Sequence, residues 1–284
     1  MYTIIDGKKI SQEIKDELKE QAAQLKERGI EKCLAVIQVG KDPASSVYVN
    51  NKKKACEYIG IRSLSYELPE KTTEEELLSL IAQLNDREDV NGILVQLPLP
   101  AGMDEDKILL AIAPEKDVDG FHPVNVGNLS IGRPGYVSCT PAGVIQLLRR
   151  SGIRIEGKEC VVLGRSNIVG KPMAALLTQA DGTVTLCHSR TPELAEITRQ
   201  ADILVSAVGK GNCVTASMVK DGAVVIDVAM NRNDAGKLCG DVDFESVSPV
   251  AGWLTPVPGG VGPMTITMLL RSTVLAAEKH HKKP

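Results

Sequence analysis

Residues 160–173 read CVVLGRSNIVGKPM. The apolar run 160–163 predicts a buried strand, which turns at Gly164, Arg165 and Ser166. After Gly170, a helix is predicted to begin at Lys171 and Pro172. Such a turn presents backbone N–H groups and the positive end of a helix dipole, and both suit a pyrophosphate. The spacing differs from Gly-x-Gly-x-x-Gly, so a plain strand–turn–helix without a ligand stays an open alternative.

Helical and strand patterns alternate along the rest of the chain. Compact apolar runs predict strands at 33–39, 92–97, 184–187, 203–208 and 223–228. Helical patterns cover 11–28, about 43–58 and the stretch that follows residues 72–75, TTEE, whose spacing is typical of a capping box. This alternation predicts an α/β chain, and the second half reads as an open doubly wound sheet.

A connecting segment divides the chain into two predicted domains. Residues 121–139 are rich in Gly, Asn, Ser and Pro, and a helix then begins at Thr140 as cap with proline next to it. The last helical pattern, from Met264 to about Lys279, is expected to pack back on the first domain. We therefore predict a catalytic domain of residues 1–139 plus 264–284 and a Rossmann-like nucleotide-binding domain of residues 140–263.

The composition excludes several classes of protein. The 284 residues carry a formal net charge of −3 and no basic stripe, so nucleic acid is not an expected partner. No apolar run is long enough to cross a membrane, and no apolar leader opens the chain. The seven cysteines form no Cys-x-x-Cys pair, which indicates reduced thiols and a cytoplasmic protein.

The residues after the strand at 184–187 indicate which dinucleotide binds. A fold that binds NAD usually places an acid there for the ribose 2′-hydroxyl, but this chain has His188, Ser189 and Arg190. A hydroxyl and a guanidinium suit a 2′-phosphate, and Arg165 could reach the same group, so the prediction is NADP. The open alternative is that Ser189 and Arg190 cap a helix that begins at Thr191.

A lysine in the first half is a candidate base. Tyr48 and Lys52 are four residues apart and so share one face of the helix predicted there. Lowering a lysine pKa from about 10.4 to about 7 takes on the order of 4 kcal/mol, which burial or a cationic substrate could supply. The alternative is a solvated face formed by Lys52, Lys53 and Lys54.

Two further segments place polar groups near strand ends. Gln96 ends the apolar strand at 92–97, at the carboxyl edge where α/β folds build their sites. Asp117 and Asp119 lie two apart before a turn, where metal ligation or turn capping are the alternatives. We predict no metal site here.

Taken together, these segments resemble the bifunctional methylenetetrahydrofolate dehydrogenase/cyclohydrolase family over almost the whole chain. The matching segments, in chain order, are YVNNKKKACEYIGI (48–61), GILVQLPLP (92–100), PEKDVDGFHPVN (114–125), CTPAG (139–143), GRSNIVGKPM (164–173), DILVSAVG (202–209) and TPVPGGVGPMT (255–265). The chain departs from the family in three places: Ser138 replaces a proline, the DVAMN at 227–231 replaces DVGIN, and His122 follows the DVDG segment.

The resemblance implies a role for each candidate residue. Lys52 looks like the catalytic lysine, with Tyr48 and Gln96 as its partners and Asp119 as the acid that holds the pterin. The residues implied to contact NADP are Gly164, Arg165, Ser166, Ser189, Arg190 and Met230, and the loop implied to border folate and nicotinamide includes Pro258, Gly259 and Gly260. A homodimer is implied as well.

The implied activity is the oxidation of 5,10-methylenetetrahydrofolate with NADP, followed by hydrolysis to 10-formyltetrahydrofolate. One alternative is a dehydrogenase without the hydrolase activity, in which Lys52 and Gln96 are present but misplaced. The other is a non-catalytic protein that senses NADP, but Tyr48, Lys52, Gln96 and Asp119 would then have no common reason to match.

Overall fold

The chain divides into two compact units, each with its own parallel sheet. The structure is a computed structural model that describes residues 2–40, 43–233 and 236–281, and for residues 43–48 it describes the backbone only. Unit 1 comprises residues 1–12 and 138–265, and unit 2 comprises residues 13–137 and 266–284. The predicted two-domain α/β class is confirmed, whereas the predicted limits of the functional domains stay a prediction.

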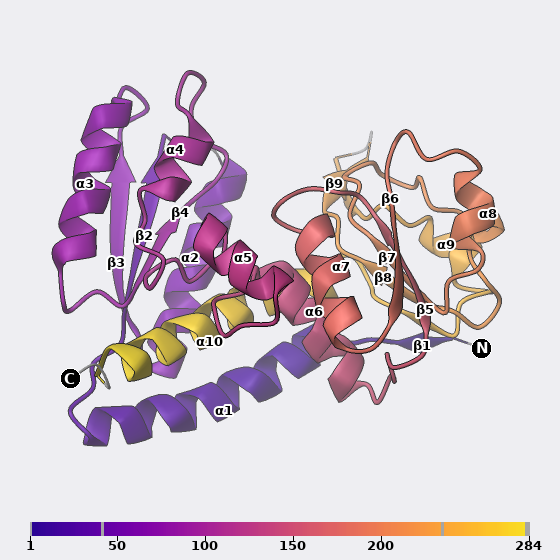
Figure 1. Ribbon diagram of the computed structural model, residues 1–284, viewed down its shortest axis with the longest axis horizontal. Coiled ribbons are helices and arrows are strands. Elements are labelled where there is room, and N and C mark those ends of the chain that lie inside the picture. Colours follow the sequence, from indigo (N-terminus) through magenta and orange to yellow (C-terminus); the bar gives the residue numbers. More distant parts are fainter. Residues whose placement is uncertain (1, 41–42, 234–235, 282–284) are drawn as a thin grey trace. The chain divides into compact units, whose positions relative to one another are not determined.

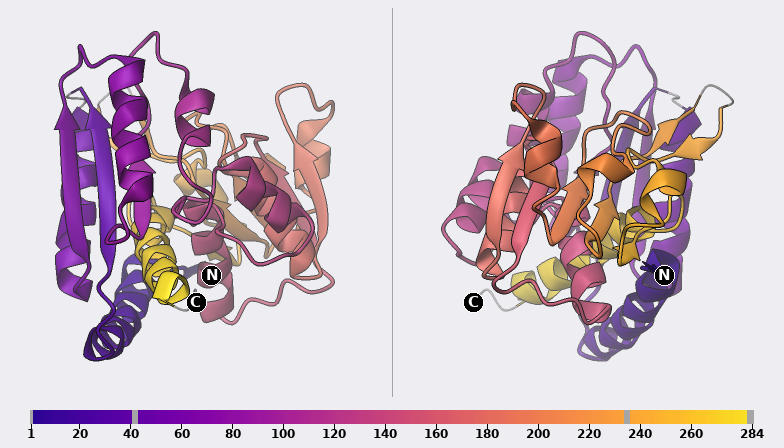
Figure 2. Two further views of the ribbon diagram at one scale, coloured as in Figure 1. Left: turned by 60° about the vertical axis from the view of Figure 1, so that its left-hand side comes forward. Right: turned by 90° about the vertical axis from the view of Figure 1, so that its right-hand side faces the viewer.

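Unit 1 contains a six-stranded sheet in which every neighbouring pair is parallel (Figure 1). Its strands, in spatial order, are β1 (Thr3–Ile4), β11 (Trp253–Leu254), β8 (Val224–Asp227), β7 (Ile203–Ser206), β5 (Glu159–Leu163) and β6 (Thr183–Cys187). The right-hand view of Figure 2 shows these strands running side by side. β7 and β8 are buried at every residue, as expected for central strands covered on both faces.

Short helices and one hairpin complete unit 1. They are α6 (Cys139–Arg150), α7 (Gly170–Gln179), α8 (Leu194–Thr198), the 3-10 helix η1 (Ala216–Met218), α9 (Phe244–Val247), and the antiparallel strands β9 (Asn231–Arg232) and β10 (Leu238–Cys239). The core of the unit includes Val161, Leu163, Leu204 and Val225. A rigid central sheet of this kind leaves the loops at its carboxyl edge to carry function.

Unit 2 contains a three-stranded parallel sheet of order β3-β2-β4. Its elements are α1 (Gly7–Glu27), β2 (Cys33–Val39), α2 (Pro43–Ile59), β3 (Arg62–Leu68), α3 (Glu74–Asp86), β4 (Gly92–Val95), α4 (Glu105–Leu110), α5 (Pro123–Ser130) and α10 (Val261–His281), of which α1 and α10 begin in unit 1. All seven residues of β2 are buried. Thr73 and Glu76 form the capping box that starts α3.

The C-terminal helix belongs to unit 2 from Ile266 onward, so the prediction that it packs on the first domain is confirmed. Its last turns carry Lys279, whose Nζ lies 4.9 Å from the centre of the Tyr136 ring. A lysine above an aromatic face is attracted by the negative charge at the centre of the ring. Tyr136 is 6% exposed, and burial raises the pKa of its hydroxyl to about 12.

Several predicted boundaries are wrong, among them the following three. α1 begins at Gly7 instead of Ser11, because Asp6 accepts a hydrogen bond from the Lys9 N–H at 3.0 Å. α6 begins at Cys139, with Ser138 in the cap position predicted for Thr140. The predicted connecting segment 121–139 contains α5, whose start is stabilised by His122, since His122 Nδ1 accepts a hydrogen bond from the Val124 N–H at 3.1 Å.

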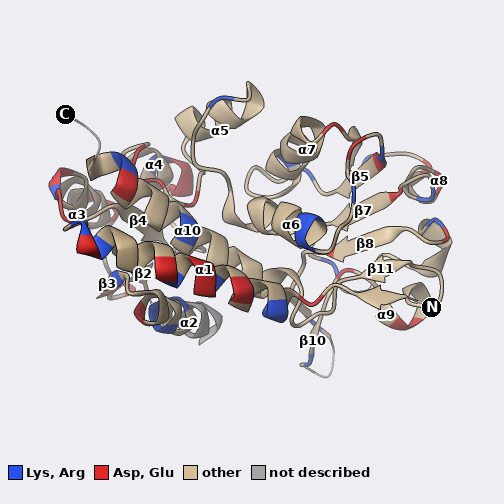
Figure 3. Ribbon diagram, turned by 90° about the horizontal axis from the view of Figure 1, so that it is seen from below, with Lys and Arg blue, Asp and Glu red and all other residues tan. Residues whose placement is uncertain are grey.

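Charge and cysteine placement agree with the composition. Acidic and basic residues interleave along α1 (Figure 3). All seven cysteines are free, and burial raises the pKa of Cys56 to about 12 and that of Cys160 to about 11. The thiols of Cys56 and Cys160 therefore stay protonated and unreactive at neutral pH. Within the described ranges, no helix has both the length and the apolar character needed to span a bilayer.

Candidate functional site

The predicted cofactor residues of unit 1 follow the carboxyl ends of neighbouring strands. Leu163 of β5 lies in register with Cys187 of β6 and with Ser206 of β7, and Ser206 lies in register with Asp227 of β8. The residues that follow these four ends include the predicted cofactor contacts Gly164, Arg165, Ser166, Ser189, Arg190 and Met230. One edge of one sheet thus brings together residues that are up to 66 positions apart in the sequence.

Glycine is required at both ends of the turn between β5 and α7. Gly164 has a φ of +108°, and a Cβ built on it would lie 2.3 Å from the Ala207 carbonyl oxygen. A Cβ on Gly170 would lie 2.0 Å from the carbonyl oxygen of Gly164. The helix and the loop after β7 therefore approach the turn more closely than any side chain permits, which is a property of dinucleotide-binding turns.

The backbone of this turn has donors to offer a phosphate. Ser166 Oγ accepts hydrogen bonds from the N–H groups of Val169 and Gly170 at 3.2 and 3.3 Å, and its carbonyl accepts one from Lys171 at 3.1 Å. Across the described chain, the N–H groups of residues 165–168 have no protein acceptor. These N–H groups, rather than those of the first turn of α7, are the ones available to a pyrophosphate.

The residues after β6 lie open at the surface. Ser189 and Arg190 are exposed. The alternative that they cap a helix is wrong, because α8 begins at Leu194 and its cap residue is Glu193. The turn is held by Thr191, whose Oγ1 accepts a hydrogen bond from the His188 N–H at 2.9 Å. Ser189 and Arg190 therefore follow the end of β6 with exposed side chains, at the strand end where folds of this kind contact the ribose.

The loop after β11 contains Pro258, Gly259 and Gly260. Gly259 has a φ of +112°, and its carbonyl accepts a hydrogen bond from the Lys8 N–H at 3.0 Å. A Cβ on Gly7 would lie 1.8 Å from the Gly260 carbonyl oxygen. The N-terminal residues of unit 1 thus brace this loop, which the sequence did not indicate.

Lys52 of unit 2 is buried, although it lies in a run of three lysines. It is 8% exposed, whereas Lys53 and Lys54 are exposed. Its Nζ donates a hydrogen bond to Gln96 Oε1 at 2.8 Å, which joins α2 to the end of β4. The alternative of a solvated lysine face is therefore wrong for Lys52 and right for its two neighbours.

Gln96 is held in one orientation toward this lysine. Its Nε2 donates a hydrogen bond to the Leu97 carbonyl at 2.7 Å, and its backbone N–H donates to the Ile37 carbonyl at 2.8 Å. With its amide nitrogen engaged in this way, Gln96 presents its carbonyl oxygen to Lys52. The side chain of Tyr48, the other predicted partner, lies outside the described residues, although its backbone belongs to α2.

Asp117 and Asp119 have different surroundings. Asp117 is 3% exposed, and its carboxylate accepts hydrogen bonds from the N–H groups of Gly120, Phe121 and His122 and from Asn125 Nδ2, at 2.8 to 3.2 Å. It therefore organises the turn, as the capping alternative stated. Asp119 is half-buried within that turn, so it is the more accessible carboxylate of the pair.

Lys116 fixes the same turn to the end of α3. It is 7% exposed, and its Nζ donates to the carbonyls of Leu84, Asn85 and Arg87 at 3.1, 2.6 and 2.6 Å. A cation bound to the last carbonyls of a helix stabilises its C-terminus. Burial lowers the pKa of Lys116. In the described ranges there is no cluster of three metal-ligating side chains.

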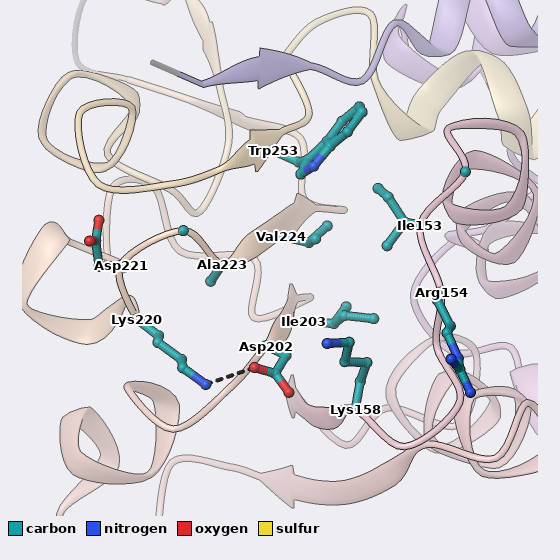
Figure 4. A pocket seen from close by; sticks show the side chains of 12 residues that line it. Ile153, Arg154, Lys158, Asp202, Ile203, Lys220, Asp221, Ala223, Val224 and Trp253 are labelled. Atoms are coloured by element: carbon teal, nitrogen blue, oxygen red, sulfur yellow. Dashed lines mark hydrogen bonds and ion pairs between the residues drawn. The ribbon is translucent and has the colours of Figure 1, made fainter.

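A separate cavity of about 250 Å³ lies at the opposite edge of the unit 1 sheet (Figure 4). Its walls include Ile203, Val224 and Trp253, at the amino ends of β7, β8 and β11. Lys220 Nζ and Asp202 Oδ1 form an ion pair of 2.7 Å across it. The dinucleotide residues follow the carboxyl ends of these strands, so this cavity is not their site.

Known proteins are similar to this chain in sequence and in fold. A family model described as the catalytic domain of tetrahydrofolate dehydrogenase/cyclohydrolase matches residues 5–119, and one described as its NAD(P)-binding domain matches residues 138–281. The "Bifunctional protein FolD" of Lachnoclostridium phytofermentans is 67% identical over 98% of this chain and 99% of its own, and that of Agathobacter rectalis is 63% identical over 98% and 100%.

Two solved structures are similar over nearly their full length. The bifunctional FolD methylenetetrahydrofolate dehydrogenase/cyclohydrolase of Campylobacter jejuni has a TM-score of 0.96 and 54% identity, and the similarity covers 98% of this chain and 99% of that one. The FolD of Trypanosoma brucei, solved with NADP cofactor and an inhibitor, has a TM-score of 0.95 and 42% identity over 99% of both chains. The resemblance drawn from the sequence motifs is confirmed.

Proposed function

The chain belongs to the tetrahydrofolate dehydrogenase/cyclohydrolase family, and from this membership we infer that it oxidises 5,10-methylenetetrahydrofolate with NADP and hydrolyses the product to 10-formyltetrahydrofolate. Relatives that carry both activities match it end to end, and nothing in the chain favours the dehydrogenase-only alternative. The protein is an oxidoreductase and a hydrolase of one-carbon folate metabolism.

The observation that carries the hydrolase assignment is the buried pair of Lys52 and Gln96. A buried amine that donates to a fixed amide carbonyl has a defined position, and a positioned proton carrier accelerates water attack. Oxidation leaves a cationic methenyl carbon between two folate nitrogens, and this charge disfavours a second cation nearby. We propose that Lys52 accepts or relays the proton of the attacking water, with Tyr48 and Gln96 orienting it.

The dehydrogenase step needs orientation more than acid–base chemistry. Bound NADP supplies the hydride acceptor. We propose that the N–H groups of residues 165–168 hold its pyrophosphate, that Arg165, Ser189 and Arg190 hold its 2′-phosphate, and that Met230 lies against it. Gly164 and Ser166 shape the turn that presents those N–H groups. Asp119 is proposed as a folate contact, and so are Pro258, Gly259 and Gly260.

Three further features belong to the proposal. The functional domains are residues 1–139 plus 264–284 for folate and residues 140–263 for NADP. The protein is cytoplasmic, as its free thiols suggest. It is a homodimer, and light scattering at micromolar concentration is expected to give twice the mass of the chain.

Two assays on the purified protein test the function. The first measures NADP reduction that depends on 5,10-methylenetetrahydrofolate, and the second measures hydrolysis of supplied 5,10-methenyltetrahydrofolate without NADP. We expect both activities. Reduction without hydrolysis above the enzyme-free rate would establish the dehydrogenase-only alternative, and neither activity would refute the assignment.

A further inference from the structure

We propose that Asp241, a fully buried carboxylate in unit 1, is a positioning residue for NADP that holds together the loops after β7 and β8. The proposal rests on the proposed NADP-dependent activity. Asp241 has 0% exposure, so it cannot touch the cofactor itself. Its effect must pass through the groups that it binds.

Asp241 accepts five hydrogen bonds, all from neutral donors. Its Oδ2 accepts from Ser206 Oγ at 2.9 Å and from the N–H groups of Val208 and Gly209 at 2.7 and 3.3 Å. Its Oδ1 accepts from the Lys210 N–H at 2.8 Å and from Asn231 Nδ2 at 3.1 Å. The donors therefore come from the last residue of β7, from three successive residues of the loop that follows it, and from Asn231, the residue next to Met230.

Three successive N–H groups that converge on one acceptor form an anion-binding nest. Here the protein's own carboxylate occupies it, so the loop 207–210 is locked in one conformation. The outer side of the same loop carries Val208, which is 49% exposed. The loop thus presents a defined surface at the carboxyl edge of the sheet, where the proposed NADP site lies.

The loop 207–210 also restricts the position of the turn between β5 and α7, which is the proposed pyrophosphate site. A Cβ on Gly164 would lie 2.3 Å from the Ala207 carbonyl oxygen and 3.6 Å from the Val208 backbone nitrogen, so the two segments are in close contact. A shift of the loop 207–210 would therefore move Gly164 or open a gap beside it. Through Asn231, the same carboxylate also restrains the segment that carries Met230.

A second buried carboxylate holds Asp241 in place. Asp227 is 3% exposed, and its Oδ1 accepts hydrogen bonds from the N–H groups of Asp241 and Ala229 at 3.0 and 3.1 Å. Its Oδ2 accepts from the Val242 N–H at 2.8 Å. A Cβ on Gly240 would lie 1.8 Å from that oxygen, so only glycine permits the approach. The two acids form one connected unit behind the cofactor edge.

An amide cannot replace the Asp241 carboxylate. Both of its oxygens accept hydrogen bonds, and asparagine would direct an NH₂ group at N–H donors on one side. Some of the backbone N–H groups would lose their acceptor, and the loop 207–210 would relax. The expected result is weaker NADP binding without loss of the hydrolase reaction, which needs no cofactor.

The test compares Asp241→Asn with Asp243→Asn, its matched control. Asp243 lies two residues further along, and within the described structure its side chain makes no capping hydrogen bond. Titration calorimetry of the full-length proteins with NADP measures the Kd, and hydrolysis of 5,10-methenyltetrahydrofolate reports the integrity of the proposed folate site. We expect at least a tenfold rise in Kd for Asp241→Asn, with hydrolysis within twofold of wild type, and no change for Asp243→Asn.

Equal NADP affinities of the two variants would overturn the proposal. If Asp241→Asn does not fold, Ser206→Ala tests the proposal instead. Ser206 is also fully buried, and its replacement by alanine removes only one of the five hydrogen-bond donors to Asp241. We expect a threefold to tenfold rise in Kd for that variant, and an unchanged Kd would refute the role of Asp241. A wild-type protein that binds NADP but reduces none of it with folate would instead refute the proposed function and leave this test valid.

Discussion

At the residue scale, one lysine differs from two identical neighbours by where it points. Lys52 is buried against Gln96, whereas Lys53 and Lys54 are exposed on the same helix. The helical spacing of Tyr48 and Lys52 predicted a shared face, but it could not decide between a solvated and a buried face. That decision depends on β4, which comes about 40 residues later in the chain.

Replacing this lysine tests its proposed role. Lys52→Met keeps most of the length of the side chain and removes its proton-carrying nitrogen. We expect hydrolysis of 5,10-methenyltetrahydrofolate to fall by a factor on the order of 100 or more, and the Kd for NADP to stay within about twofold. Lys53→Met is the control and is expected to keep full activity. Normal hydrolysis by Lys52→Met would refute the role.

The exposed residues after β6 predict a choice between dinucleotides. Because Ser189 and Arg190 are exposed and do not cap α8, their side chains are available to a 2′-phosphate. The double variant Ser189→Ala, Arg190→Ala is expected to weaken NADP about tenfold or more and NAD less than about twofold. Calorimetry measures the affinity of the double variant for each dinucleotide. Equal losses of affinity for NADP and NAD would count against 2′-phosphate recognition.

Asp227 predicts a dependence of stability on pH. Burial raises its pKa to about 6, so the folded protein holds this proton more tightly than the unfolded chain does. The stability from this group is complete below about pH 4 and is lost as pH rises to about 6, by up to about 3 kcal/mol.

Urea unfolding of wild type and Asp227→Asn at pH 4.5 and pH 7 isolates this contribution. Other acids affect both proteins alike, so only the difference between the two proteins reports on Asp227. The advantage of wild type over the variant should be larger at pH 4.5 than at pH 7. An advantage that grows with pH would show that the pKa of Asp227 is lowered by folding.

At the scale of elements, the candidate sites lie in the loops after parallel strands, held by buried polar residues. In unit 1 these are Asp227 and Asp241, and in unit 2 they are Lys116 and Asp117. The strands could be predicted from apolar runs. Turn capping by Asp117 was one of the alternatives predicted from the sequence. The roles of Asp227, Asp241 and Lys116 could not be predicted, because each of them binds backbone groups whose positions depend on the finished fold.

Replacing Lys116, which binds the end of α3, tests whether buried polar residues hold these loops in place. Lys116→Met would leave three carbonyls without their buried donor, so we expect a loss of about 2–3 kcal/mol in the stability of unit 2. The turn with Asp119 would also shift, which raises the KM for folate while NADP affinity stays unchanged. Lys107→Met, which breaks an ion pair of a lysine that is 55% exposed, should cost much less stability, because solvent screens that pair.

Denaturation by urea and steady-state kinetics measure both effects for the two variants. Equal stability losses for Lys116→Met and Lys107→Met would show that the buried lysine does not hold the helix end. An unchanged KM for folate in Lys116→Met would separate the turn from the proposed folate site.

At the scale of the whole molecule, alternation of strands and helices predicted the α/β class and the nucleotide-binding half. The strands it missed are β1, β3, β9, β10 and β11, and most of these have only two residues, too few to form a pattern. β1 joins residues 1–12 to a sheet whose other strands begin at residue 159. Pairing over such a distance cannot be read from local sequence.

The central claim is that one chain oxidises a folate one-carbon unit and then hydrates it. The most direct measurement supplies 5,10-methylenetetrahydrofolate with two deuterons on the methylene carbon, together with NADP, in ¹⁸O-labelled water. Mass spectrometry of the products is predicted to find one deuteron in NADPH, the other on the formyl carbon, and ¹⁸O in the formyl group, formed faster than without enzyme. Unlabelled NADPH, or labelled NADPH with formyl release no faster than in enzyme-free solution, would contradict the account.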